Sequence, residues 1–331
     1  MMTFKKLLIL TSLSIIFIIQ PAIAAEYQQV AGLIDTRTTF SDGAFDVEAL
    51  ARLAKQRGFD VLFINDHDLL AMEYGLAPLK NILKKRVELN SINKGGAENY
   101  LNAVNKAREK YPDMILIPGS ESVPFYYWKG SFVKQNLTAH DHEKRILTIG
   151  MEKPEDYKNL PIIHNGFSTR YLNQSLPVVI VFLISFVLGL LLLMDRGYFR
   201  ISGLIISGLS FLFMINAHPF QSSPFDQYHG NQGIAPYQLL IDYVNTKGGF
   251  TFWNYPETGS GVRKLGPIFL NTPPYPAALE QSVDYTGFAA LYGDNITATE
   301  PGHQWDRVLL DFCNGKRKQP VWGIATADYH S

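Results

Sequence analysis

Two uncharged apolar stretches in the middle of the chain restrict its fold more than any other feature of the sequence. They cover residues 176–194 and 201–217, and a short polar loop, residues 195–200, joins them. The first stretch is long enough to cross a bilayer as a helix, whereas the second is slightly short and rich in Gly and Ser. The simplest interpretation is a transmembrane helical hairpin over residues 176–217. A buried hairpin inside a soluble core is the alternative, although uncharged stretches of this length are rare there.

The loop between the two stretches indicates how such a hairpin would be oriented. It carries Arg196 and Arg200, and an excess of positive charge marks the cytoplasmic side of a membrane protein. Gly203 and Ser207 lie one helical turn apart, so they would let a neighbouring helix approach closely. We therefore expect the chain on both sides of the hairpin to lie outside the cytoplasm.

The amino-terminal segment, residues 1–25, indicates the same destination. Lys5 and Lys6 precede an apolar run over residues 7–19, and small residues follow at positions 22–24. This is the layout of a secretory signal peptide with a cleavage site, and an uncleaved anchor is the alternative. In both cases we expect a bacterial inner-membrane protein whose polar segments lie in the periplasm.

The two segments that flank the hairpin, residues 26–175 and 218–331, form the polar part of the chain. A length of 331 residues suffices for one large domain or two small ones. The formal net charge is zero, which argues against a nucleic-acid binder. Cys313 is the only cysteine, so an internal disulfide and a cysteine-based zinc site are excluded. The chain ends at Ser331 directly after a polar motif, and we expect it to be truncated there.

Short apolar runs alternate with amphipathic patterns in both flanking segments. We expect strands over residues 30–34, 61–64, 114–117, 146–149, 250–253 and 321–325, and helices over residues 47–56, 76–88, 97–110, 237–245 and 304–312. Asp46 is the expected N-cap of the first helix, and Gly58 follows its end. Alternating strands and helices, with polar residues at the carboxyl ends of strands, predict an α/β barrel or a doubly wound sheet.

Several aromatic and histidine residues outside these elements have two interpretations. The aromatic run over residues 125–128 is expected at a membrane interface, and a loop that stacks on a substrate is the alternative. His140 and His142 are either solvated surface residues or ligands from a shifted loop. His164 and His218 lie near the ends of the hairpin, and we expect no chemical role for them.

Polar side chains gather where the first two predicted strands end. The turn Ser41-Asp42-Gly43 follows the first strand, and Asp66-His67-Asp68 ends the second. Neighbouring strand ends would bring these carboxylates and the imidazole to one edge, and both groups are ligands of divalent metals. Ordinary turn and strand-end polar residues are the alternative explanation.

Five motifs, in this order, are similar to those of the polymerase and histidinol phosphatase (PHP) superfamily. They read IDTRTTFSDG at residues 34–43, INDHD at 64–68, IPGSE at 117–121, GGFTFWNYPE at 248–257 and ATADYH at 325–330. The resemblance covers nearly everything outside the signal peptide and the hairpin. It implies a distorted (β/α)7 barrel, here interrupted by a two-helix transmembrane hairpin. It also implies up to three metal ions and hydrolysis of phosphomonoesters or phosphodiesters with Mn, Fe, Zn or Mg.

The family's metal ligands are only partly retained in this sequence. The resemblance assigns metal-binding roles to Asp42, His67, Glu121, Asp328 and His330. The two leading histidines of the family are Asp35 and Arg37 here, and two later histidines fall on Arg145 and Tyr255. Arginine has no lone pair to donate, so a metal position that depends on Arg145 is lost.

The resemblance therefore implies a reduced metal centre. The site of Asp42, His67 and His330 is complete, so one ion is expected there. Asp35, Glu121 and Asp328 would hold a second, weaker ion, and a third is not expected. Carboxylate-rich ligands favour Mn or Mg over Zn or Fe.

Asp35, Arg37 and Asp66 form the candidate catalytic set. Asp66 and Asp68 flank His67, and we expect them to support it rather than to bind metal directly. Arg37 and Arg145 are interpreted as replacements for missing metal charge among buried carboxylates. Gripping a substrate phosphate is their alternative role.

Two functions follow from these expectations. The first is a membrane-anchored, extracytoplasmic phosphoesterase in which a metal activates water for attack on a phosphorylated small molecule. The second is a PHP-like module without catalysis that binds a ligand or scaffolds a membrane protein partner. The lipid bilayer is a partner in both, and no nucleic acid is expected. A transporter is poorly supported, because the hairpin has no charged residue within its spans.

Overall fold

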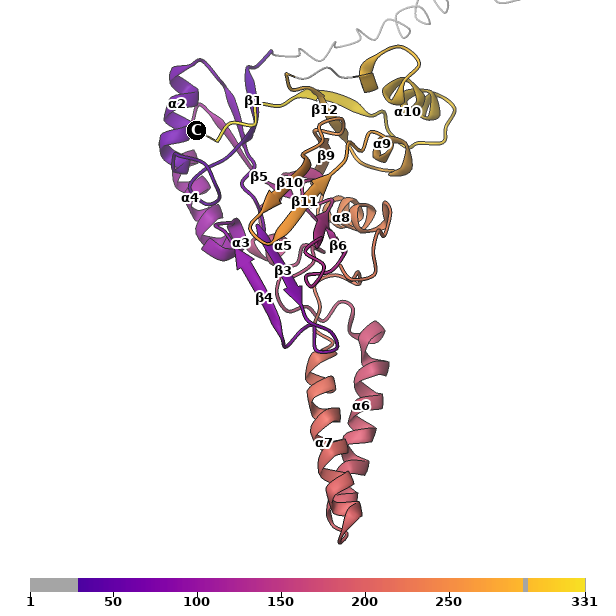
Figure 1. Cartoon of the computed structure of the whole chain (residues 1–331). Coiled ribbons are helices and arrows are strands. Elements are labelled where there is room, and N and C mark those ends of the chain that lie inside the picture. Colours follow the sequence, from indigo (N-terminus) through magenta and orange to yellow (C-terminus); the bar gives the residue numbers. More distant parts are fainter. Residues whose placement is uncertain (1–28, 294–296, 331) are drawn as a thin grey trace, which may run out of the picture. The chain divides into compact units, whose positions relative to one another are not determined.

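A mixed seven-stranded sheet organises the computed structural model, which describes residues 29–293 and 297–330 (Figure 1). The signal peptide predicted over residues 1–25 lies outside the described residues. In their order across the sheet, the strands are β1 (Gly32–Thr36), β2 (Val61–Ile64), β5 (Ile115–Ser122), β8 (Arg145–Ile149), β9 (Phe250–Asn254), β12 (Gly287–Leu291) and β13 (Trp322–Ala325). β8 runs antiparallel to both of its neighbours, and the other pairs are parallel.

The sheet curls so that its first and last strands approach each other. Ile34 of β1 and Ile324 of β13 pack in one apolar cluster with side chains of the strands between them. Beyond β13, the backbone N–H of Ala327 donates to the carbonyl of Ile34 at 3.1 Å, and that of Tyr329 donates to Asp35 at 3.0 Å. These bonds join the two edges of the sheet at the end where the polar motifs lie. The structure therefore confirms a curled α/β architecture, as expected for a barrel of the PHP type.

The helices form largely where the hydrophobic pattern predicts them. The helix α2 (Val47–Gln56) has the predicted bounds, and the Asp46 carboxylate accepts a hydrogen bond from Ala49 N at 2.7 Å as its N-cap. α2 packs beside α4 (Ala97–Lys110), which also has its predicted bounds (Figure 1). The remaining helices of this part are α3 (Ile92–Gly95), α5 (Pro154–Lys158), α8 (Ala235–Thr246), α9 (Ala278–Gln281), α10 (Gln304–Cys313) and the 3-10 helix η1 (Thr297–Thr299).

The predicted helix over residues 76–88 is wrong. This region belongs to an antiparallel hairpin of β3 (Ala71–Gly75) and β4 (Lys84–Glu88). Glu73 is buried in β3, and Lys84 pairs with its carboxylate at 3.0 Å. The backbone of Glu73 also bonds to the Tyr126 hydroxyl at 2.8 Å and to Trp128 Nε1 at 3.0 Å, so contacts outside this segment override the helical propensity of the lysines.

A second, four-stranded sheet was absent from the predicted elements. Its order is β10 (Gly261–Leu265), β11 (Ile268–Thr272), β7 (Thr138–His140) and β6 (Tyr127–Lys129). The aromatic run over residues 125–128 leads into β6, and its side chains are at most 7% exposed. These residues are core rather than a membrane-interface cluster or a stacking loop, so both interpretations of the run are wrong.

The two uncharged stretches form adjacent helices, α6 (Leu172–Leu193) and α7 (Tyr198–Asn216) (Figure 1). Both are long and apolar enough to cross a membrane, and only 6% and 17% of their most apolar windows is buried. Helices of a soluble core would be mostly buried, so that alternative is not supported. A Cβ atom added to Gly203 would lie 2.7 Å from the carbonyl oxygen of Gly189. The predicted close approach at Gly203 is thus confirmed.

This close approach predicts that Gly203→Leu weakens the hairpin while Gly208→Leu does not. Gly208 lies in the same helix, and a Cβ atom there would meet no atom within 4 Å. Overpacking a tight contact costs about 1–3 kcal/mol, so Gly203→Leu should lower the unfolding temperature in detergent micelles. Equal unfolding temperatures for the two variants would contradict the tight helix contact.

Candidate functional site

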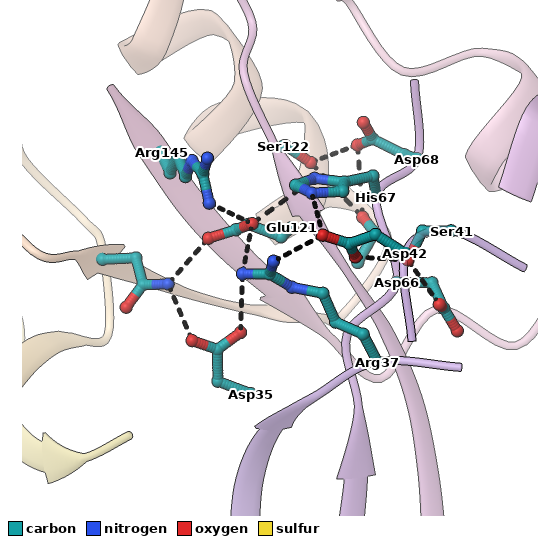
Figure 2. Close-up of polar contacts among 12 residues, drawn as sticks. Asp35, Arg37, Ser41, Asp42, Asp66, His67, Asp68, Glu121, Ser122 and Arg145 are labelled. Carbon is teal, nitrogen blue, oxygen red and sulfur yellow. Dashed lines mark hydrogen bonds and ion pairs between the residues drawn. The ribbon is translucent and has the colours of Figure 1, made fainter. Parts of the chain in front are cut away.

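The curled sheet brings most of the predicted site residues to one edge. Asp35 is the last but one residue of β1, Glu121 lies near the end of β5, and His67 follows β2, where it forms a parallel bridge with Glu121. Arg145 begins β8, and because β8 is antiparallel to β5, its first residue reaches the same edge. Asp328 follows β13. Figure 2 shows the side chains of Asp35, His67, Glu121 and Arg145 converging on the guanidinium of Arg37 or on its partners.

The Arg37 side chain lies at the centre of this cluster and is 3% exposed. Its guanidinium reaches Asp328 Oδ1 at 2.7 Å, Glu121 Oε2 at 2.9 Å, Asp42 Oδ2 at 3.2 Å and Asp35 Oδ1 at 3.9 Å. Burial alone would lower the pKa of Arg37, but the surrounding carboxylates, Glu121 foremost, raise it above its usual range. The cluster therefore contains a permanent positive charge.

Glu121 is fully buried and remains ionised. Burial alone would raise the pKa of its carboxyl group, but Arg145 and Arg37 together lower the pKa to about 2. Arg145 Nη1 lies 3.0 Å from Glu121 Oε2, His67 Nδ1 lies 3.4 Å from the same oxygen, and Asn254 donates to Oε1 at 2.8 Å. The residue that would bridge two metals in the family is thus surrounded by protein donors.

Asp35 is held by hydrogen bonds as well as by charge. Its Oδ2 accepts from Asn254 Nδ2 at 3.0 Å and from the Tyr255 hydroxyl group. Burial, together with the charge of Glu121, raises the pKa of Asp35 to about 6. Tyr255 stands where the family has a histidine, and it serves here as a hydrogen-bond donor. Asn254 was not predicted as a site residue, although it lies beside Tyr255 in the fourth motif.

His67 and Asp42 approach each other on the more open side of the cluster. His67 Nε2 lies 3.8 Å from Asp42 Oδ2, and the Asp42 side chain is 42% exposed. Burial raises the pKa of Asp42, but His67 and Arg37 lower it below its usual range. His330 does not join them through its side chain in the described part of the chain. It is exposed, and its contact with this region is the carbonyl group that accepts from Ala44 N at 3.1 Å.

Asp66 supports the loop that carries Asp42. Its fully buried carboxylate accepts from Thr38 N at 2.7 Å, from the Thr38 hydroxyl at 2.7 Å and from the Ser41 hydroxyl at 2.6 Å. These bonds hold the turn after β1 against the end of β2. The geometry gives Asp66 a structural position, whereas Asp35 and Arg37 of the same predicted catalytic set lie in the carboxylate cluster.

Asp68 points away from Arg37, toward the buried hydroxyl groups of Ser120 and Ser122. Its carboxyl group accepts from the Ser122 hydroxyl group (Figure 2). It also accepts from the Ser120 hydroxyl group and from Leu69 N. Among the described residues it forms no ion pair with Lys or Arg, and burial raises its pKa to about 7. Asp68 is thus protonated in the folded protein at pH values where the unfolded chain has lost this proton.

This difference predicts that the folded state loses stability as the pH rises from about 4 to about 7. Within that window the folded state binds one proton more at Asp68, which corresponds to about 1.4 kcal/mol per pH unit. Asp68→Asn removes the titration and should reduce the slope of unfolding free energy against pH by about one proton. Urea unfolding in detergent at three pH values measures it. An unchanged slope would contradict the buried, protonated state of Asp68.

The described residues do not fit the metal centre that the resemblance implies. Within residues 29–293 and 297–330, no group of three or more His, Cys, Asp or Glu side chains is arranged to hold a metal ion. Arg37 lies among the carboxylates that would share the ions, and a guanidinium cannot be a ligand. The His140 ring stacks on Tyr127, and His142 Nε2 lies 3.4 Å from Glu143 Oε1. Neither contact is with a residue of the cluster around Arg37. The charge-replacement interpretation of Arg37 fits this geometry.

Comparison with known proteins gives only distant similarities. No protein-family model and no curated protein sequence matches the chain. A structure from Bifidobacterium adolescentis, provisionally described as a metal-dependent phosphoesterase, has 13% identity and a TM-score of 0.41, with 92% of this chain and 90% of that chain covered. A two-domain protein from Bacteroides vulgatus, with a provisionally described PHP-like metal-dependent phosphoesterase, has 11% identity and a TM-score of 0.37, with 92% and 53% covered.

A third similar structure is an amidohydrolase from Chromobacterium violaceum with bound sulfate and no metal. It has 12% identity and a TM-score of 0.38, with 92% of this chain and 88% of that chain covered. This chain spans about half the length (53%) of the Bacteroides protein. At these TM-scores the similarities carry no assignment of activity or of residue roles to this chain.

Proposed function

We propose that this chain is a membrane-anchored, extracytoplasmic PHP-like module in which arginine has replaced the metal ions. It acts as a ligand-binding or scaffolding domain of a membrane complex rather than as a metal-dependent hydrolase. The supporting observation is Arg37, whose guanidinium contacts three carboxylates within 3.2 Å. Its charge and donors take the part that a divalent cation would play among these oxygens. Because the Arg37 guanidinium is 3% exposed and engaged by these carboxylates, it is not free to hold a substrate phosphate.

The membrane anchor in this proposal is the α6–α7 hairpin. Apolar side chains project outward along both helices, and exposing them to water would be unfavourable, whereas a bilayer would accommodate them. Arg196 in the connecting loop and Arg200 in the first turn of α7 favour a cytoplasmic position for this end of the hairpin under the positive-inside rule. The curled sheet then lies on the periplasmic side of a bacterial inner membrane.

A reduced metal-dependent phosphoesterase is the second candidate. Asp42 and Asp328 keep side chains that are 42% and 46% exposed, and Asp42 lies 3.8 Å from His67. Oxygen and imidazole ligands at a solvent-accessible position could take one Mn or Mg ion, which would supply an activated water. The resemblance to the PHP motifs supports this candidate, and the arginine-filled cluster opposes it.

Phosphoesterase assays on the purified full chain separate the two candidates. Para-nitrophenyl phosphate and bis-para-nitrophenyl phosphate, with added Mn or Mg, serve as generic monoester and diester probes. We expect no turnover above that of His67→Ala, because Arg37 keeps the shared metal positions closed. Metal-dependent turnover that disappears in His67→Ala would reject the non-catalytic proposal and establish the second candidate.

A further inference from the structure

The loop between β3 and β4 leaves apolar side chains half exposed in the described structure. Residues 76–83 read LAPLKNIL, and Leu76 and Leu83 are 56% and 53% exposed. A cluster of exposed leucines at a hairpin tip is unfavourable in water and often marks an interaction surface. What this loop contacts can be derived from its position along α7.

Hydrogen bonds attach this loop to the end of α7. Asn81 N donates to Asn216 Oδ1 at 2.9 Å, and Asn81 Nδ2 donates to the Asn216 carbonyl group at 2.7 Å. Asn216 is the last residue of α7, a helix of 19 residues. Such a helix is roughly 28 Å long, which is close to the thickness of the hydrocarbon core of a bilayer. If α7 spans the bilayer, the loop lies where hydrocarbon meets the lipid headgroups.

Aromatic residues flank the hairpin at the same end. Phe167 precedes α6 and is 85% exposed, and Phe220 follows α7 and is 41% exposed. Their rings lie edge to face, with centroids 6.4 Å apart. Large rings beside the ends of spanning helices are typical of the interfacial region of a membrane. The two phenylalanines and the leucines of the loop thus lie at the same end of the hairpin.

Lysines stand directly behind the apolar tip. Lys84 and Lys85 begin β4 and are exposed, and Lys84 is also paired with Glu73. Lysine side chains beside an apolar membrane contact can extend their ammonium groups toward lipid phosphates. Within the loop, Lys80 Nζ lies over the Tyr228 ring, 4.1 Å from its centroid, so Lys84 and Lys85 are the lysines next to the exposed leucines that can reach a headgroup region.

We propose that residues 76–83 are embedded in the periplasmic leaflet of the same bilayer that α6 and α7 cross. Leu76 and Leu83 enter the interfacial region, and Lys85 approaches lipid phosphate. This inference rests on the proposed membrane span of α6 and α7. The loop is a third point of membrane contact beside the two helices, and it fixes how the curled sheet faces the lipid.

Site-specific fluorescence in vesicles tests this contact. The full chain carries one native cysteine, Cys313, which is exposed on α10 and serves as the control label. In a Cys313→Ser background, Leu83→Cys places the label at the loop, and Leu188→Cys places it on the outer face of α6. Each protein is labelled with an environment-sensitive dye and reconstituted in phosphatidylcholine vesicles that contain nitroxide-labelled lipid.

The expected result is a blue shift and a loss of emission for the labels at positions 83 and 188, with little change at Cys313. A label at position 83 that behaves like Cys313, while position 188 is quenched, would reject the loop contact and leave the membrane span intact. If position 188 is not quenched either, both the span and this inference fail. Adding phosphatidylglycerol should increase quenching at position 83, and no increase in that arm would reject the lysine–phosphate contact.

Discussion

Replacing Arg37 by alanine should lower the free energy of unfolding by about 3–5 kcal/mol, because removing one partner of a buried ion pair leaves the other charges uncompensated. The guanidinium is 3% exposed and contacts Asp42, Glu121 and Asp328 at 2.7–3.2 Å. Arg37→Lys should recover only part of this loss, since an ammonium group cannot reach carboxylates on several sides. Urea unfolding of the full chain in detergent, followed by tryptophan fluorescence, measures both effects.

Arg307→Ala is the matched control for this substitution. Arg307 pairs with Glu280 at 3.1 Å, but its side chain is 54% exposed. Exposed ion pairs contribute little, so the expected change is about 0–1 kcal/mol. If Arg37→Ala destabilised the protein no more than Arg307→Ala, Arg37 would not be the internal cation of the cluster.

Glu121→Gln is expected to be similarly costly, at about 3–5 kcal/mol, although it keeps the size and one hydrogen-bonding oxygen of the side chain. The substitution removes the buried anion that Arg37 and Arg145 share at 2.9 Å and 3.0 Å. The guanidinium groups of Arg37 and Arg145, whose side chains are 3% and 21% exposed, would then lack the carboxylate between them. The same unfolding measurement applies, with Glu280→Gln as the control on the exposed pair.

The double variant Arg37→Ala/Glu121→Gln distinguishes charge pairing from packing. Because the two residues interact directly, their combined effect should be smaller than the sum of the single effects. Additive effects would mean that Arg37 and Glu121 stabilise the protein through separate contacts, and the charge-replacement account would lose its main pair.

The parts of the site that follow strand ends could be predicted from the sequence. Asp35, His67 and Glu121 each come at the end of a short apolar run, and parallel strands bring such ends to one edge. The role of Arg37 as a replacement cation also follows from elementary chemistry, because a guanidinium among carboxylates cannot be a ligand but can neutralise them. The structure places it among them, as this interpretation requires.

Other parts depend on contacts that no local pattern reveals. Asn254 joins Asp35 to Glu121 through one amide group, and its place in the fourth motif does not show which side chains that amide contacts. His330 keeps its motif, yet its backbone alone meets the turn after β1. A motif match therefore identified a position in the fold but could not show where the side chain lies.

Two errors of secondary structure and burial have a common physical cause. The lysine-rich segment before Glu88 has helical propensity, but the buried Glu73 pairs with Lys84 and makes it a strand. The aromatic run ending at Trp128 is compatible with a membrane interface, but the β3–β4 hairpin covers it, and Trp128 Nε1 donates to the carbonyl of Glu73 at 3.0 Å. Contacts with residues outside each segment decide both.

Metal content is the most direct test of the claim that arginine replaces the metal ions. The full chain, purified in detergent, is equilibrated with Mn and separated from free ions, and its bound metal is measured by inductively coupled plasma mass spectrometry. The account predicts far less than one ion per chain, with no difference between the unsubstituted protein and His67→Ala. One equivalent of Mn in the unsubstituted protein, lost in His67→Ala, would contradict it.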